Sequence, residues 1–309
     1  ISLIKVKWFF FLLFGFQVIL KKRMWTQFLV IIGVEFLMGF LSFFSDFKTV
    51  FFYIAFLFIC LLVKVNLKQL VFAIAMIGIA FFLGIKWTSI KGEYRKFLNQ
   101  GSKTQTVNVE NNEAFKKLMD LTKEKSDFDK AAVNMLDRIQ YTYHFSKVMD
   151  RVPSVIPYQD GHNWGSILSY TLTPRLLNSS KPKIDNSIKT TKYTGISYLS
   201  AQSGVSFSLG YFADSYVDFG YYGMMIPLFL IGLFYGATYF YFVRKSSPNI
   251  IFNFSVVGAL FMEFQGFEMD GMYFLGRIFA SVLTFFMLKI FVFPWIYDNL
   301  VIKPNAIRE

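Results

Sequence analysis

The chain has 309 residues, of which 54% are hydrophobic, 40 are Phe and only 17% are charged. A soluble globular protein usually has about a quarter charged residues, so this composition indicates a membrane protein and argues against a soluble enzyme. The formal net charge of +12 does not indicate nucleic acid, because much of it lies in short segments beside apolar runs, as orientation signals and contacts with anionic lipids do. The single Cys60 excludes a disulfide framework within the chain and a cysteine-cluster metal site.

Seven apolar runs divide the chain, and each is a candidate membrane span. They cover residues 1–20, 26–44, 50–63, 70–87, 221–243, 250–264 and 272–296. A helix needs about 20 apolar residues to cross the hydrocarbon core. We therefore expect an all-α polytopic membrane protein with about seven transmembrane helices. The chain begins at Ile1, without Met and already in apolar sequence, so we also expect an N-terminal part to precede it. The first run has no small-residue cleavage site, so we expect it not to be a cleavable signal peptide.

The Lys and Arg residues of the short connections predict the orientation. Lys21 to Arg23 follow the first run, Lys64 and Lys68 precede the fourth, and Arg244 follows the fifth, whereas the alternate connections are poor in positive charge. By the positive-inside rule, the positive connections are cytoplasmic. The chain then divides into four transmembrane helices in residues 1–87, an extracytoplasmic loop in 88–220, and three transmembrane helices with a cytoplasmic tail in 221–309.

The long segment 88–220 has two parts. Residues 112–151 have a helical pattern that is largely free of Gly and Pro, and Pro153 and Pro157 end it. Residues 154–220 are rich in Ser, Thr, Gly, Tyr and Pro and lack periodicity, so we expect irregular structure there.

The stretch from Tyr158 to Trp164 combines an acid, an imidazole, an amide and an indole within seven residues. Such a group can bind sugar, because an indole stacks on a pyranose face and Asp160 and Asn163 can bond hydroxyls. The alternative is a glycine turn with an interfacial Trp anchor.

A basic stretch follows, with Arg175, Lys181 and Lys183 as its main cations. The planar guanidinium fork of Arg suits phosphate oxygens, and Lys adds point charge. The alternative is a solvated loop or one that contacts anionic lipids.

Arg277 is a charge inside the last apolar run, near its expected outer end. A charge in a span usually has a partner or a ligand. Glu263, Glu268 and Asp270 precede it and are candidate ion-pair partners, a ligand is the second interpretation, and snorkelling to the interface is the third. The chain has only two histidines, so a His-rich metal site is excluded, and it has no Gly-rich phosphate loop.

These residues resemble the external-loop pattern of the bacterial oligosaccharide repeat-unit polymerases, the Wzy-type O-antigen and capsule polymerases. The resemblance covers roughly residues 138–236, with Tyr158 to Gly161, Thr173 to Leu177, Lys181-Pro182 and Asp214 to Gly223 as its sharpest parts. The chain departs from the family pattern where Asp214 stands in place of a common Glu and Asp218 in place of a common Asn.

The resemblance implies metal-independent and cofactor-free glycosyl transfer at the bacterial inner membrane, outside the cytoplasm. The substrates are oligosaccharide repeats on undecaprenyl diphosphate, and the further partners are membrane lipids, a chain-length regulator and a flippase, with no nucleic acid. The implied acid–base residues are Asp160, His162 and Asp214. The implied diphosphate- or glycan-binding residues are Arg138, Arg151, Trp164, Arg175, Lys181, Lys183 and Arg277. The alternatives are an O-antigen ligase-type transfer and a non-enzymatic lipid-linked glycan transporter or scaffold.

Overall fold

The structure is a computed structural model, and it contains helices but no strand among the residues that it describes. The described residues are 2–41, 47–61, 67–102, 107–123, 128–139, 141–173, 186–197, 207–244, 250–264, 266 and 268–300. The chain forms two compact units, the first from Ile1–Trp25, Lys147–Tyr198 and Phe207–Glu309, and the second from Thr26–Ser146 and Leu199–Ser206.

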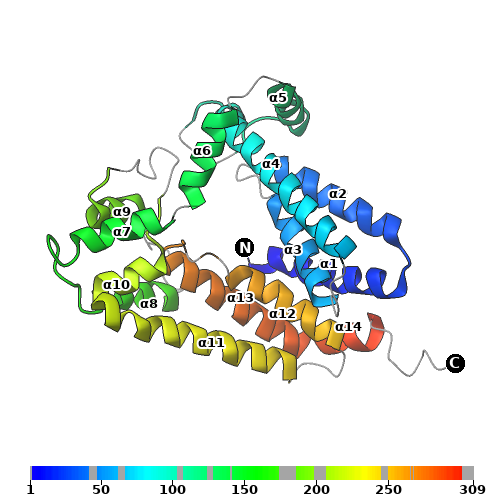
Figure 1. Ribbon diagram of the computed structural model, residues 1–309. Coiled ribbons are helices and arrows are strands. Elements are labelled where there is room, and N and C mark those ends of the chain that lie inside the picture. Colours follow the sequence, from blue (N-terminus) through cyan, green and yellow to red (C-terminus); the bar gives the residue numbers. More distant parts are fainter. Residues whose placement is uncertain are drawn as a thin grey trace. The chain divides into compact units, whose positions relative to one another are not determined.

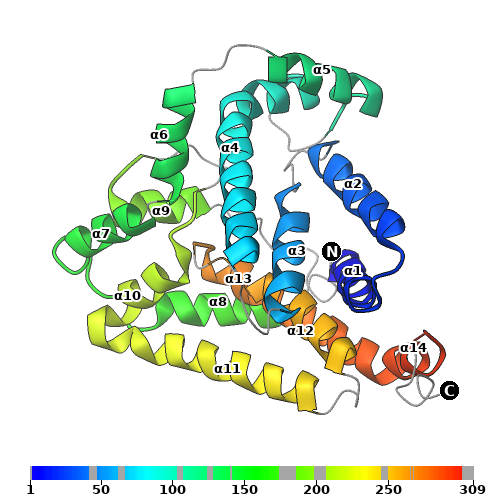
Figure 2. The same cartoon turned by 45° about the vertical axis from the view of Figure 1, so that its right-hand side comes forward.

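The first unit contains α1, α8 to α14 and the C-terminal end of α7 from Lys147 onward (Figure 1). Their bounds are α1 Ser2–Lys21, α7 Tyr141–Arg151, α8 His162–Leu172, α9 Asn186–Thr194, α10 Gly210–Gly223, α11 Met225–Arg244, α12 Ile250–Phe264, α13 Gly271–Phe291 and α14 Phe293–Leu300. Helices α11, α12 and α13 lie side by side, and α8 packs against both α10 and α13 (Figures 1 and 2).

The second unit contains α2 Trp25–Leu41, α3 Lys48–Leu61, α4 Leu67–Leu98, α5 Asn111–Lys123 and α6 Phe128–Ile139. The apolar face of α5 packs on the end of α4, with Leu118 and Leu121 in one buried cluster with Tyr94 and Leu98. These α5 residues recur every three or four positions, which is the spacing of one helix face.

Two helices among the described residues are long and apolar enough to cross a membrane, namely Met225–Val243 of α11 and Gly271–Phe291 of α13. The expectation of about seven transmembrane helices is therefore wrong. Helices α2, α3 and α12 have 17, 14 and 15 residues. At 1.5 Å per residue such helices are shorter than the roughly 30 Å hydrocarbon core.

The two remaining expected spans, residues 1–20 and 70–87, form parts of α1 and α4. Packing and charge distinguish these two helices from the candidate spans. Helix α1 carries Lys5 and Lys7 and buries most of its aromatic side chains, with the Phe9 ring 5.1 Å from that of Phe252. Helix α4 continues beyond the expected apolar run into a charged segment that includes Glu93 and Arg95.

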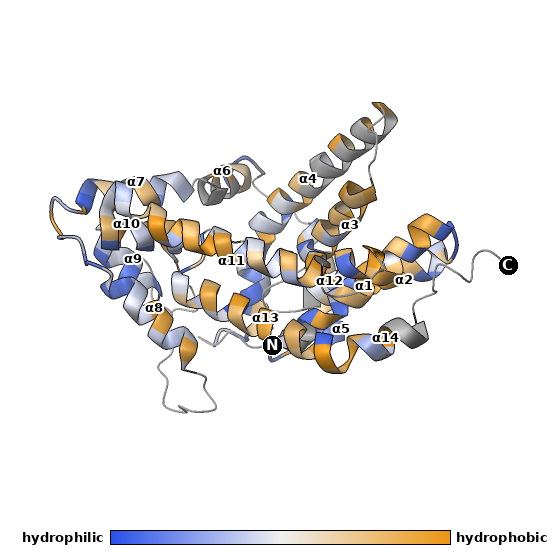
Figure 3. Cartoon of the chain, turned by 90° about the horizontal axis from the view of Figure 1, so that it is seen from below, coloured by the Kyte–Doolittle hydropathy of each residue, from blue (hydrophilic) through white to orange (hydrophobic). Residues whose placement is uncertain are grey.

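The side chains of the two candidate spans remain mostly uncovered. Only 17% of the apolar window in α11 and 22% of that in α13 is buried, whereas the core helix of a soluble protein is mostly buried. Figure 3 shows hydrophobic residues along both helices. Phe229 and Leu233 of α11 are exposed. A long exposed apolar surface of this kind fits lipid contact.

The prediction of helices between 112 and 151 is confirmed for the described residues, where α5, α6 and α7 cover most of the segment and α7 ends before Pro153. Within this segment, α6 covers Phe128–Ile139 and α7 covers Tyr141–Arg151. The expectation of irregular structure in 154–220 is wrong where α8, α9 and α10 form.

Candidate functional site

A tight turn precedes α8 and carries the acid of the sugar-binding pattern. Asp160 and Gly161 both have left-handed backbone angles, with φ of 47° and 88°. The turn is fixed to α10, because the Gln159 N–H donates to the Val217 carbonyl at 3.0 Å and the Asp160 N–H donates to the Asp218 carbonyl at 3.1 Å. Asp is one of the few residues other than Gly that tolerates this conformation.

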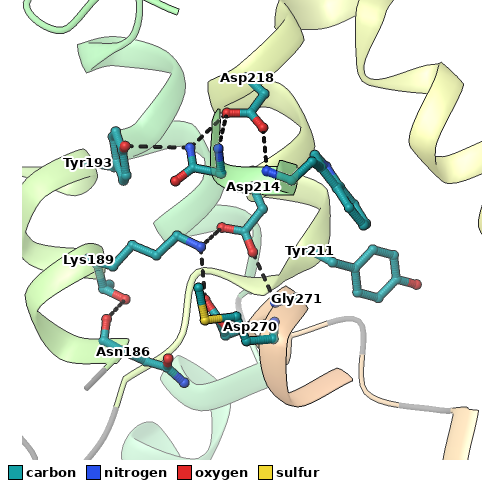
Figure 4. A network of polar contacts seen from close by, with 12 residues as sticks. Asn186, Lys189, Tyr193, Tyr211, Asp214, Asp218, Asp270 and Gly271 are labelled. Atoms are coloured by element: carbon teal, nitrogen blue, oxygen red, sulfur yellow. Dashed lines mark hydrogen bonds and ion pairs between the residues drawn. The ribbon is translucent and has the colours of Figure 1, made fainter. Parts of the chain in front are cut away.

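The first turn of α8 is capped from another helix. Its N-cap residue, Gly161, has no side chain to offer. The Asp218 carboxylate instead accepts from the Asn163 N–H at 3.1 Å, from the Asn163 side-chain amide at 2.9 Å and from the Trp164 N–H at 2.8 Å (Figure 4). A carboxylate at this position accepts hydrogen bonds from backbone N–H groups that have no partner within the helix, and its negative charge interacts favourably with the positive end of the helix dipole. Asp218 therefore holds the start of α8 against α10.

One face of α8 lines an open cavity of about 660 Å³. The lining residues are Gln159, Asp160, Gly161, His162, Gly165, Ser166, Ser169, Tyr170, Thr173 and Met272. Those on α8 recur at intervals of three and four residues, so they share one helix face. The volume falls within the roughly 300–1,000 Å³ range of ligand sites.

The lining is rich in side chains that form hydrogen bonds. Asp160 and His162 lie two residues apart at the start of α8, and both side chains are exposed. A carboxylate and an imidazole can accept and donate protons, and the Ser, Thr and Tyr hydroxyls can each donate and accept a hydrogen bond. No group of three or more His, Cys, Asp or Glu side chains among the described residues is arranged to hold a metal ion.

A buried ion cluster joins α9, α10 and the start of α13. The Lys189 ammonium lies 2.5 Å from Asp214 Oδ1 and 3.0 Å from Asp270 Oδ2 (Figure 4). The other Asp214 oxygen accepts from the Gly271 N–H at 3.0 Å, and the other Asp270 oxygen accepts from the Met272 N–H at 2.9 Å. This cluster fixes the start of α13, from which Met272 reaches the cavity lining.

Burial and the neighbouring opposite charge shift the pKa values of Asp214 and Lys189 in opposite directions. Complete burial raises the pKa of Asp214, Lys189 lowers it, Asp270 raises it further, and the pKa comes to about 6. Burial lowers the pKa of Lys189, but its two carboxylate partners outweigh burial, so that its pKa is raised. The Lys189 ammonium therefore lies between two buried carboxyl groups.

The raised pKa predicts a pH-dependent stability. Because the pKa of Asp214 is about 6 in the folded protein instead of its ordinary 3.8, the folded state binds this proton more tightly than the unfolded chain does. Its contribution to stability is therefore complete below pH 3.8 and is lost as the pH rises through about 6. Thermal unfolding of the wild type and of Asp214→Asn across this range should show the wild type losing stability relative to the variant as the pH rises. A constant difference would contradict this assignment.

Gly271 leaves no room for a side chain. A Cβ at this position would press on the Ile167 side chain of α8 and would lie 3.2 Å from Asp214 Oδ2. We expect Gly271→Ala to lower the free energy of unfolding by about 1–3 kcal/mol, as overpacking of a buried contact does. The matched control is Gly276→Ala on the same helix, where a Cβ meets nothing within 4 Å. Equal unfolding temperatures for the two variants would contradict the packing argument.

The structure brings two of the candidate acid–base residues together and separates the third from them. Asp160 and His162 both line the cavity, whereas Asp214 is fully buried and paired with Lys189. A side chain with no exposed surface cannot contact a substrate, so the structure gives Asp214 a structural role. The sequence pattern did not reveal Lys189 and Asp270 as its partners, because they lie 25 and 56 residues away in the chain.

Two of the candidate binding residues, Trp164 and Arg151, lie in the first unit but do not line the cavity. Trp164 is buried and its indole N–H donates to Ser215 Oγ at 3.1 Å, so its ring does not line the cavity. The Arg151 guanidinium donates to the Lys192 carbonyl of α9 at 3.2 Å, and Arg151 is absent from the cavity lining.

The remaining cations are outside the cavity lining or outside the described residues. Arg138 lies on α6 in the second unit. Arg277 lies on α13, partly exposed, and interacts electrostatically with Tyr235 of α11. Asp270, one of its expected partners, is instead bound by Lys189. Arg175, Lys181 and Lys183 lie outside the described residues.

A protein-family model described as "Domain of unknown function (DUF8712)" matches residues 4–241 of the chain. The chain belongs to this family. The match includes α8, α9 and α10, and therefore most of the cavity and two of the three members of the ion cluster. No curated protein matches the chain, and no solved structure matches it.

Proposed function

We propose that this DUF8712 protein polymerises undecaprenyl-diphosphate-linked oligosaccharide repeat units into surface polysaccharide by metal-independent glycosyl transfer. The observation that supports this proposal is the α8 cavity, where Asp160 and His162 adjoin a helix face with serine, threonine and tyrosine hydroxyls. Sugars are recognised through their hydroxyl groups, and transfer to a sugar hydroxyl needs a proton acceptor. The resemblance of the same segment to Wzy-type polymerases agrees with this chemistry.

In the proposed reaction, a hydroxyl of the acceptor sugar attacks the anomeric carbon of the donor glycan. The new C–O bond replaces the bond to the diphosphate, which leaves with its electron pair, and Asp160 or His162 accepts the hydroxyl proton. The leaving diphosphate needs cations. The cavity lining described above contains no Lys or Arg. We assign that role to Arg175 and Lys181, which follow the lining residue Thr173 in the sequence, and to Arg277 on α13.

The two candidate spans support placing the cavity at the extracytoplasmic face of the bacterial inner membrane. Helix α13 begins beside the cavity at Met272, and α11 follows α10, which packs on α8. The opposite ends of both spans are cationic, with Arg244 ending α11 and the Lys289 ammonium donating to the Tyr241 carbonyl at 3.0 Å. Positive charge favours the cytoplasmic side, so the cavity end faces outward.

Two other functions share part of this support. A ligase would use the same donor and move the finished glycan to another acceptor, so the same cavity chemistry applies to it. A non-enzymatic transporter or scaffold would need the cavity only for binding, and it would not depend on Asp160 and His162 as proton acceptors.

A deletion strain separates these functions through its surface glycan. Loss of the polymerase leaves single-repeat products on the surface, and plasmid-borne wild type restores long chains. Long chains that stay on the lipid carrier would indicate a ligase, and complete loss of surface glycan would indicate a transporter; either result would overturn the proposal.

The proposed diphosphate contact at Arg175 predicts that even a conservative change is harmful. Loss of one fixed donor costs about 2–4 kcal/mol of transition-state stabilisation, or roughly a hundredfold in rate. We expect Arg175→Lys to be nearly as poor as Arg175→Ala, because an ammonium cannot reproduce the bidentate guanidinium fork. The measurement is glycan chain length at equal protein abundance. Normal chain length in Arg175→Ala would remove this residue from the site.

A further inference from the structure

Gly165 is the residue of the cavity-lining α8 face that has no side chain. A Cβ built at this position meets nothing within 4 Å, and the backbone has no left-handed φ that would require glycine. Glycine destabilises the interior of a helix relative to alanine. Neither close packing nor backbone geometry therefore explains a glycine here, and its effect on the molecule is to leave open space above the middle of the α8 face.

The neighbours of this open space are suited to a sugar ring. Ser166, Ser169 and Tyr170 adjoin Gly165 on the same helix face, and Met272 lines the cavity from α13. The hydroxyls can bond the ring substituents, while the Tyr170 ring and the Met272 thioether offer apolar contact. From His162 to Thr173 the face is roughly 16 Å long, at 1.5 Å per residue, so it can hold a short run of sugar rings.

We propose that Gly165 is the specificity-determining position of this cavity. A sugar ring of the acceptor glycan lies against the bare α8 backbone at Gly165, with the acceptor hydroxyl directed toward Asp160 and His162. The absence of a side chain sets the size of ring that the site admits. This inference rests on the proposed function for the identity of the ligand.

The test uses cysteine variants on a Cys60→Ser background. Gly165→Cys introduces a thiol into the open space, and Gly92→Cys on α4 is the matched control, because Gly92 is also helical and exposed with nothing within 4 Å. The probe is the lipid-linked repeat unit extracted from the deletion strain, and undecaprenyl phosphate without sugar is its control. We expect the repeat unit, but not the bare carrier, to slow methanethiosulfonate labelling of the Gly165→Cys thiol and to leave labelling of Gly92→Cys unchanged.

Turnover provides the second measurement. Labelled Gly165→Cys should lose chain lengthening and regain it when dithiothreitol removes the label, whereas labelled Gly92→Cys should stay active. Gly165→Ala should raise the melting temperature, because alanine favours the helix, yet lower kcat/KM by roughly tenfold, mainly through KM. A merely structural role would move stability and activity in the same direction.

The outcomes separate this inference from the proposed function. Equal labelling rates with and without the repeat unit, or full turnover by labelled Gly165→Cys, would overturn the role of Gly165 even if the protein polymerises. If the repeat unit protects the Gly165→Cys thiol but the wild-type protein never lengthens chains, the binding site is supported and the polymerase is refuted.

Discussion

Replacing Lys189 with Met is expected to lower the free energy of unfolding by about 3–5 kcal/mol, the cost of breaking a buried ion pair from one side. Lys189 contacts two carboxylates, and Asp214 and Asp270 are 0% and 2% exposed. Methionine fills most of the lysine volume but leaves the two negative charges buried without their cation. Thermal unfolding of the detergent-solubilised protein measures the loss.

The chain offers a control on the same helix. Lys192 is exposed and its ammonium lies over the Tyr193 ring, so Lys192→Met should change stability by only about 0.5 kcal/mol or less. Adding Asp214→Asn to Lys189→Met should restore part of the lost stability, because one of the two repelling charges is then removed. Equal stability of Lys189→Met and the wild type would show that the cluster does not hold α9, α10 and α13 together.

Asp160→Asn is expected to lower the rate of chain lengthening by roughly 10²- to 10⁴-fold, the usual contribution of a positioned acid–base group. The change tests chemistry with little effect on folding, because Asn has the same shape and tolerates the left-handed conformation at this position, where φ is 47°. The measurement is the rate of product formation at equal protein abundance and with unchanged melting temperature.

His162→Gln on the other side of Gly161 tests whether the two groups act together. If Asp160 and His162 form one catalytic unit, the double variant should be no slower than the slower single variant, as residues that act as a unit are non-additive. Asp150→Asn on α7 is the control, because Asp150 is exposed and pairs only with the nearby Lys147 in the contacts described. Normal rates in both single variants would remove this pair from the chemistry.

The sequence predicted the helical class and placed Asp160 and His162 in one candidate site, but it overestimated the number of spans and did not foresee the burial of Trp164. An apolar run shows that a segment is hydrophobic. It does not show how long the helix is or which of its faces packs against protein, because both depend on tertiary packing. Phe9 illustrates this, because it belongs to an apolar run yet is fully buried against Phe252 and Phe293.

The candidate site could be predicted only where its residues are close in the sequence. Asp160 and His162 are two positions apart and were recognisable together. The cap of α8 was not recognisable from the sequence. The capping carboxylate belongs to Asp218, more than 50 residues away, and Gly161 has no side chain that could act as a cap. The role of Asp214 was misjudged for the same reason, since its burial and its partner Lys189 are properties of the folded chain.

The most direct test of the proposed function is chain lengthening by the purified protein in lipid vesicles. The vesicles contain the lipid-linked repeat unit from the deletion strain and a chelator that removes divalent metals. The proposal predicts a ladder of lengthened glycans with the wild type, retained with Asp150→Asn and nearly absent with Asp160→Asn. A wild-type protein that leaves the repeat unit unchanged, or an Asp160→Asn ladder equal to that of the wild type, would contradict it.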